Sequence, residues 1–431
     1  MRTIILGLLL GVASVSYAQV DYFPPVNGEW ETRNPSELGF CSDSIASLFD
    51  YLENTDTKAF LLIQDGKIVL EQYATDFDQQ SNWYWASAGK TLTAFLLGLA
   101  QEQGFLNLED PSSQFLGEGW TSLAPESEAA IRLIHQLTMT TGLNDQGDVF
   151  CTDPQCLTYM ADPGTRWSYH NAPYTLLTEV IASASGMSYN EFTRTQLYDR
   201  IGMQGAWLPN GYNNVHWSTP RSMARFGLLI ANEGIWEGDT ILSDREYFRE
   251  MIEPSQNLNQ SYGYLWWLNG QPSFMLPGSQ FVFSSSLVPE APEDAFFALG
   301  KNAQMLAIMP SQGRVLVRMG NDPGTDLISI EYARNLFQRI ENLECTTSAN
   351  QTQHVNPNIK TYPNPVRDFL NWECPEKIHT MEIWDTQGRR ILDQKVNAQQ
   401  GQCSVQHLPK GMYFLRAVGV TTTYQSIIYV D

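Results

Sequence analysis

The residues of this sequence best suited to chemistry begin with a serine and a lysine three positions apart. Ser87 and Lys90 lie in the segment WASAGK, at the start of an apolar run that predicts a helix. Residues i and i+3 share one face of a helix, so the hydroxyl and the amine can meet there. A serine becomes a nucleophile when a base lies beside it, and a desolvated lysine with a lowered pKa is such a base. The start of the helix also favours negative charge that develops near Ser87.

Tyr169, with Asn171 two residues later, is the second candidate group. It lies in PGTRWSYHNAPY, after a Pro-Gly turn and a tryptophan and directly before an apolar helical pattern. Tyr212 and Asn214 repeat the spacing, but we favour Tyr169 because of these flanking elements.

Lys301 is a third candidate, because Lys90 and Lys301 are the only lysines between Lys67 and Lys360. His135 and His170 suggest a Ser-His pair instead. The sequence has no Gly-x-Ser-x-Gly elbow, however, so we interpret both histidines as core or loop residues.

The apolar pattern around these residues predicts helices and strands in a definite order. Residues 42–52 should form a helix, AFLLIQDGKIVLEQY a hairpin turning at Asp65-Gly66, and GKTLTAFLLGLAQEQG a helix that ends at Gly104. Mostly helical sequence follows, then short strand-like runs, and residues 327–343 have helical periodicity. We therefore predict an α+β fold. Both ends of the chain contribute to one antiparallel sheet that helices flank, with a helical subdomain between.

The C-terminal part differs in composition. Residues 346–357 are polar and lack large apolar side chains, as expected of a linker. Alternating apolar residues and glycine turns then predict a small all-β sandwich. The expected organisation is a signal peptide (1–18), an α+β domain (19–345), the linker and the β-sandwich (358–431).

The first residues have the pattern of an export signal. Arg2 is followed by an apolar run over 4–12 and by Ser16-Tyr17-Ala18, a small-x-small cleavage site. No apolar run reaches the roughly 20 residues of a membrane span, so we expect no transmembrane segment in the mature chain. The formal net charge of −21 disfavours nucleic acid and anionic membranes as partners, and 43% hydrophobic residues exclude a disordered chain.

Six cysteines in an exported chain suggest disulfides. If the first and last helices of the α+β domain pack antiparallel, one cysteine before the first meets one after the last. The candidate pairs are Cys41–Cys345 on this reasoning, Cys151–Cys156 around a short loop, and Cys374–Cys403 in the C-terminal module; other pairings stay open. The sequence has no Cys-x-x-Cys or His-x-x-x-His pair, so it indicates no metal site, and we expect no cofactor.

Residues 25–343 resemble the serine β-lactamase-related family, which includes class C β-lactamases, D-Ala-D-Ala carboxypeptidases, esterases and 6-aminohexanoate-dimer hydrolase. The family carries Ser-x-x-Lys, Tyr-x-Asn and then Lys-Thr-Gly or a His- or Tyr-bearing variant. The first two motifs match at residues 87–90 and 169–171. The third corresponds to Lys301-Asn302-Ala303, where Asn replaces Thr and Ala replaces Gly. LNLEDPSSQFL, LTMTTGLND and STPRSMARFGLLIANEG also look like family segments.

This resemblance implies a β-lactamase/transpeptidase-like fold and an acyl-enzyme on Ser87. Lys90 and Tyr169 would share the proton of the serine, and Tyr169 would then protonate the leaving group. The backbone N–H groups of Ser87 and Gln304 would form the oxyanion hole. Water would release the acyl group.

The resemblance also implies roles for the supporting residues. Asn171 would orient Lys90 or a substrate amide. Lys301 would lower the pKa of Tyr169 and attract a substrate carboxylate. Ala303 places a methyl where the family's glycine lets the substrate approach, and Asn302 replaces a hydroxyl that helps to hold the carboxylate. We therefore expect weak β-lactam turnover and clear activity on small esters or amides.

From about Tyr362 the segments YPNP, IWDTQGRR and LPKGMYFL resemble the C-terminal sorting domain of type IX secretion. The resemblance implies a secreted or cell-surface protein whose partner is the type IX secretion machinery, and a tail that is dispensable for catalysis. A carbohydrate-binding β-sandwich is the alternative for this module.

Three functions of the α+β domain are compatible with these patterns. The leading one is a serine hydrolase acting on a small ester, amide or peptide. A peptidoglycan D,D-peptidase or β-lactamase is the alternative within enzymes, and a non-catalytic surface binding protein of the same fold is the alternative of another class. The intact Ser87, Lys90 and Tyr169 favour an enzyme, and a fluorophosphonate label separates the two classes.

Overall fold

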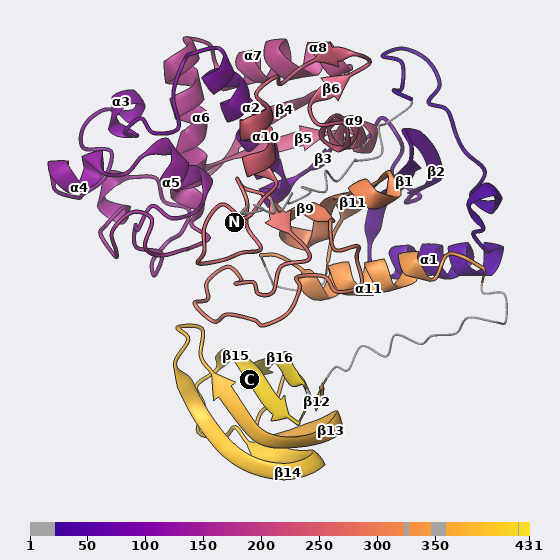
Figure 1. Ribbon diagram of the computed structural model, residues 1–431, viewed down its shortest axis with the longest axis vertical. Coiled ribbons are helices and arrows are strands. Elements are labelled where there is room, and N and C mark those ends of the chain that lie inside the picture. The colour runs from indigo at the N-terminus through magenta and orange to yellow at the C-terminus, as the bar shows by residue number, and fades with distance from the viewer. Residues whose placement is uncertain (1–21, 323–326, 346–358, 421) are drawn as a thin grey trace, which may run out of the picture.

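The computed structural model describes residues 22–322, 327–345, 359–420 and 422–431. The predicted signal peptide (1–18) and linker (346–357) lie outside these residues. The described chain forms an α+β domain up to Cys345 and a smaller all-β module from Ile359, each with a buried apolar core (Figure 1). None of the helices in the described ranges is both long enough and apolar enough to cross a membrane.

The main sheet of the α+β domain is antiparallel and joins both ends of the domain, as predicted. Its strands stand in the order β2-β1-β11-β10-β9-β8. Their bounds are β1 Thr57–Gln64, β2 Lys67–Tyr73, β8 Trp267–Leu268, β9 Phe296–Gly300, β10 Gln304–Met309 and β11 Arg314–Gly320. The β1–β2 turn uses Asp65 and Gly66 with φ of 52° and 86°, as the predicted type I′ turn requires.

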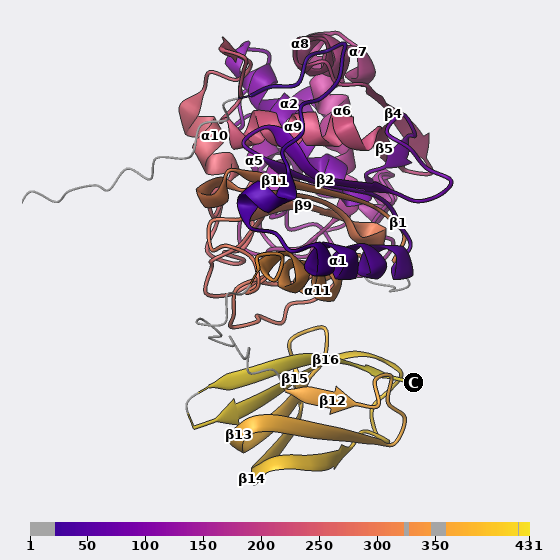
Figure 2. The same cartoon turned by 90° about the vertical axis from the view of Figure 1, so that its right-hand side faces the viewer.

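Helices cover both faces of this sheet (Figure 2). α9 (Pro220–Ala231) packs on one face against β1, β10 and β11. α1 (Ser42–Asn54) and α11 (Ile330–Glu341) lie side by side on the other. A disulfide joins Cys41 to Cys345 just outside these two helices, with 5.1 Å between the Cα atoms. The predicted pairing of the first and last helices is confirmed.

The helical subdomain and a small sheet are inserted between β2 and β8. The small sheet has the order β3-β5-β4. The inserted elements are β3 Trp83–Tyr84, α2 Lys90–Glu102, α3 Ser113–Leu116, α4 Pro125–Ala129, α5 Leu133–Leu137, α6 Asn171–Ser185, α7 Tyr189–Thr193, α8 Asp199–Ile201, β4 Gly205–Asn210, β5 Asn213–Ser218, α9, β6 Ile235–Trp236, β7 Asp239–Thr240 and α10 Arg245–Met251. Every residue of α2 from 90 to 100 is buried, because this helix is apolar on all sides and runs through the core.

The C-terminal module is built from β12 Lys360–Tyr362, β13 Phe369–Trp384, β14 Arg390–Ser404, β15 Gly411–Gly419 and β16 Thr423–Val430. β13 is its centre and pairs with β12, β14 and β15. The predicted Cys374–Cys403 bridge is wrong, because both are buried free thiols. Leu370, not Cys374, lies opposite Cys403. The two cysteines are therefore offset by four residues, or about 13 Å along the strands, which is too far for a disulfide. The predicted Cys151–Cys156 bridge is present.

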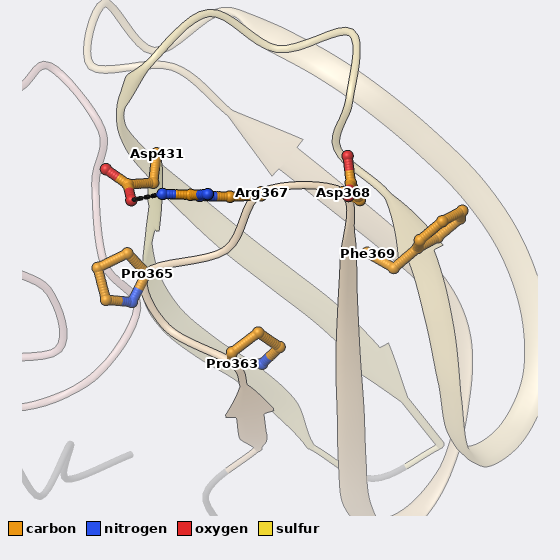
Figure 3. Close-up of a pocket in the computed structure, with 6 residues that line it drawn as sticks. All are labelled: Pro363, Pro365, Arg367, Asp368, Phe369 and Asp431. Atoms are coloured by element: carbon orange, nitrogen blue, oxygen red, sulfur yellow. Dashed lines mark ion pairs between the residues drawn. The ribbon is translucent and has the colours of Figure 1, made fainter.

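The module contacts the α+β domain through one loop. Phe281 stacks on Phe414 with ring centroids 4.9 Å apart, and Phe283 meets the same ring edge to face at 5.0 Å. The Gln280 N–H donates to the Thr386 carbonyl oxygen over 2.9 Å. The module also has a cavity of about 400 Å³, shown in Figure 3. An ion pair between Arg367 and Asp431 lines that cavity. The cavity lies in the C-terminal module, whereas Ser87 lies in the α+β domain.

Candidate active site

Ser87 stands in a tight turn that leads into the central helix. The 3-10 turn Ala86–Gly89 (η2) follows β3 and passes directly into α2, whose first residue is Lys90. The Lys90 Nζ lies 3.0 Å from Ser87 Oγ. Ala86 has a φ of 49°, a left-handed conformation that costs energy for a residue with a Cβ. The serine is thus presented on a strained turn with the amine at hydrogen-bond distance.

Lys90 is an amine held in an apolar and aromatic environment. Its side chain belongs to a residue only 2% exposed, and its Nζ lies 4.3 Å from the ring centroid of Tyr174 and 5.0 Å from that of Tyr169. Burial lowers the pKa of Lys90 to about 7, because water no longer solvates the ammonium form. A large fraction of the amine is therefore neutral at pH 7 and can accept a proton.

Tyr169 is 4% exposed, and the Ser87 side chain lies close enough to its hydroxyl to lower its pKa somewhat. Its ring stacks on Trp267 with centroids 5.7 Å apart. Burial raises the pKa of Tyr169 above its usual value of 10. The expectation that Lys301 lowers this pKa is wrong: the Lys301 side chain is exposed, and desolvation of the phenol dominates. Tyr169 is protonated at neutral pH.

Asn171 opens α6 and connects that helix to the lysine. Its Oδ1 accepts a hydrogen bond of 2.6 Å from Lys90 Nζ. Its Nδ2 is buried and has no partner among the described residues. The side chain therefore fixes the amine and leaves both N–H donors of its amide unused.

Lys301, Asn302 and Ala303 form the turn between β9 and β10. Asn302 and Ala303 have φ values of 62° and 54°. The fully buried Arg318 donates to the Asn302 carbonyl oxygen over 2.7 Å, and the Asn302 Nδ2 donates to Tyr84 Oη over 2.6 Å. Ala303 is 3% exposed. The expectation that its methyl meets the substrate stays a prediction, since Lys90 and Tyr169 of the same site are equally buried.

Gly300 is a position beside Ser87 that the sequence patterns did not single out. A Cβ there would lie 3.1 Å from the Ser87 backbone nitrogen and 2.5 Å from the Trp85 carbonyl oxygen, so only glycine lets β9 end against the turn that carries Ser87. Gln304 pairs with Gly300 across the hairpin, and its buried side chain bonds Gly320. In the sequence, the glycine that ends the strand-like segment FFALG is the feature that could have pointed to this position.

The other candidates lie outside this arrangement. Tyr212 is exposed and its hydroxyl donates to Asp153. His135 accepts from the Arg132 backbone N–H, and His170 is buried at the start of α6. Neither histidine is hydrogen-bonded to Ser87 within the described chain.

Comparison with known proteins assigns a family to each of the two domains. A family model described as Beta-lactamase matches residues 49–338, and one described as Secretion system C-terminal sorting domain matches residues 360–430. An uncharacterized protein from Alkalihalophilus pseudofirmus is 24% identical over 332 residues, which cover 68% of this chain and 88% of that protein.

Two solved structures share the fold at low identity. A penicillin-binding protein homologue from Caulobacter crescentus has a TM-score of 0.54 at 14% identity and covers 70% of this chain and 98% of its own. A family VIII carboxylesterase has a TM-score of 0.53 at 13% identity and covers 71% and 99%. The chain belongs to the Beta-lactamase family of serine hydrolases, and it ends in a sorting domain of type IX secretion, which indicates a secreted or cell-surface protein.

Proposed function

We propose that this protein cleaves a small ester or amide through an acyl-enzyme on Ser87. The observation that carries the proposal is the 3.0 Å contact between Ser87 Oγ and Lys90 Nζ, together with a Lys90 pKa of about 7. A base with a pKa near the working pH combines a large neutral fraction with useful basicity.

The proton transfers follow from the two perturbed groups. As Ser87 Oγ attacks the substrate carbonyl, neutral Lys90 takes the hydroxyl proton. Protonated Tyr169 then donates its proton to the leaving alkoxide or amine and is reprotonated from the Lys90 ammonium. Water attacks the acyl-enzyme in the second half, gives its proton to Lys90, and the proton returns to Ser87 Oγ.

The oxyanion would be held by backbone N–H groups at the contact between η2 and β9. The first donor is the Ser87 N–H. We propose the N–H of Lys301 as the second, because Gly300 lies directly against Ser87 and Lys301 is the next residue. Gln304, which the motif indicated, pairs with Gly300, and its strand β10 also contacts the Ser87 turn, so the Gln304 N–H is the alternative second donor. Two such donors in a water-poor site strongly stabilise a developing oxyanion.

The hydrogen bond that the Asn302 amide makes to Tyr84 favours esters or amides over β-lactams as substrates. One N–H of the Asn302 amide donates to Tyr84 Oη, so at most one N–H is left to hold a substrate carboxylate. Lys301 is exposed and forms no ion pair within the described ranges, so it still attracts an anionic group. A carboxylesterase is among the proteins that share this fold.

The test compares kcat/KM for p-nitrophenyl acetate and butyrate, nitrocefin and a D-Ala-D-Ala peptide, in the wild type and in Ser87→Ala. We expect ester turnover that Ser87→Ala abolishes, with nitrocefin well below about 10⁴ M⁻¹s⁻¹, the lower end of the ordinary enzyme range. Nitrocefin turnover at or above that value contradicts the substrate assignment. Turnover that survives in Ser87→Ala contradicts the nucleophile, and absence of both turnover and labelling indicates a binding protein.

A further inference from the structure

Four partly exposed aromatic rings contact one another in series, and one of them, Tyr84, is bound to Asn302 of the candidate active site. Phe77, Trp83, Tyr84 and Trp217 are all partly exposed, whereas the other large aromatic side chains nearby, such as Trp85 and Trp267, are fully buried. The rings form a continuous series of contacts, with centroid distances of 5.8 Å (Phe77–Trp83), 5.3 Å (Trp83–Tyr84) and 5.5 Å (Tyr84–Trp217).

The small sheet β3-β5-β4 gives this series its orientation. Tyr84 on β3 lies directly opposite Trp217 on β5, so the two side chains share one face. Their neighbours Trp85 and His216 pack edge to face at 4.7 Å and are fully buried. One face of the sheet therefore belongs to the core, and the face with Tyr84 and Trp217 is the outer one.

This outer face is joined to the reacting centre through the turn after β9. Tyr84 Oη accepts the 2.6 Å bond from Asn302. Asn302 is two residues from Gly300, whose backbone lies against Ser87, and Tyr84 is three residues before Ser87. The strained turn is held by the buried Arg318, so the Tyr84 ring is fixed relative to the serine.

We propose that Tyr84 and Trp217 form a substrate subsite for an aryl group, so that the favoured substrate is an aromatic ester or amide. The proposal rests on the function proposed above and names its substrate class. Aromatic faces bind planar rings by stacking, and a saturated ring of equal size cannot use that geometry. A fixed ring loses little freedom when a ligand stacks on it.

The experiment uses two matched pairs of esters and the full-length protein. Benzyl acetate against cyclohexylmethyl acetate places the ring in the alcohol, and methyl phenylacetate against methyl cyclohexylacetate places it in the acyl group. We expect kcat/KM, measured by pH-stat, to favour the aryl member of at least one pair by about fivefold, the factor expected of one aromatic contact. Trp217→Leu should reduce that ratio to near one, and so should Tyr84→Leu.

The control is Tyr159→Leu, which removes an exposed tyrosine of the helical subdomain and should leave the ratio unchanged. Equal kcat/KM within both pairs overturns the subsite, as does an aryl preference that Trp217→Leu leaves intact. Failure of the proposed function looks different: no ester is cleaved and a fluorophosphonate does not label Ser87. Labelling of Ser87 without ring preference refutes the subsite alone.

Discussion

Replacing Asn171 by aspartate should switch the candidate base off at neutral pH without moving it. The Asn171 Oδ1 lies 2.6 Å from Lys90 Nζ, and aspartate has nearly the same shape. A carboxylate at that distance stabilises the ammonium form, and an opposite charge within about 4–6 Å raises a lysine pKa by about 1–3.

The size of the effect follows from the Lys90 pKa of about 7. At pH 7 about half of the amine is neutral in the wild type. If the pKa rises to about 9 in Asn171→Asp, about 1% is neutral, so acylation should be roughly 50-fold slower at pH 7. The two proteins should approach each other near pH 10, where both amines are neutral.

The assay is the rate constant for fluorophosphonate labelling between pH 5 and 10. The wild-type rate should rise with a midpoint near 7, and the Asn171→Asp midpoint should lie about one to three pH units higher. Asn171→Leu is the matched control, since it removes the same hydrogen bond without adding charge and should not raise the midpoint. A pH-independent loss of rate in Asn171→Asp, or a wild-type profile without a midpoint near 7, would refute Lys90 as the base.

Four further results are expected. Lys90→Met should abolish labelling yet raise Tm at pH 6, because burial lowers the Lys90 pKa from 10.5 to about 7. The cost of burying the charged ammonium in the folded protein is complete below pH 7 and decreases to zero as the pH approaches 10.5. An increase in Tm at pH 10 as large as the increase at pH 6 would therefore contradict the assignment. Gly300→Ala should slow labelling at least about 100-fold, because the added methyl pushes β9 away from the Ser87 turn. Gly147→Ala is the control and should have no effect, since a Cβ at Gly147 meets nothing within 4 Å. Similar labelling rates in both variants would contradict the importance of the contact between Gly300 and the Ser87 turn. Peptide mapping without reductant should find Cys41–Cys345 and Cys151–Cys156, and Cys41→Ser should lower the free energy of unfolding by about 5 kcal/mol. Cys374 and Cys403 should be alkylated only after unfolding, because burial raises the pKa of both thiols to about 11. Ready alkylation of Cys403 in the native protein would contradict the fold of the C-terminal module. A chain that ends at Cys345 should still label at Ser87 and lose export in a type IX-competent host, while binding more of an apolar dye because Phe281 and Phe283 lose Phe414; unchanged dye binding would show that the two domains are not docked in solution.

Local chemistry accounts for the features that the sequence patterns predicted correctly. The Asp65-Gly66 turn needs only two residues that tolerate positive φ. Ser87 and Lys90 are only three positions apart, so a single helical turn brings their side chains together. The Cys41–Cys345 bridge follows from amphipathic helices that must cover the same face of one sheet.

The features that were missed depend on contacts between distant segments. Gly300 matters because β9 ends against a turn more than 200 positions earlier in the chain. The periodicity of apolar residues carries no information about a close contact between such distant segments. The Cys374–Cys403 prediction failed because strand register is invisible in composition. The direction of the Tyr169 pKa was misjudged because burial of the phenol outweighs a cation that stands in solvent.

The central claim is that Ser87 is the nucleophile of this site, and covalent labelling tests it most directly. A fluorophosphonate should add one probe mass to the intact protein, and tryptic mapping should place it on the peptide that ends WASAGK at Lys90. Ser87→Ala should then carry no adduct while keeping its wild-type Tm. Labelling of a different serine, or an adduct that persists in Ser87→Ala, would contradict the account.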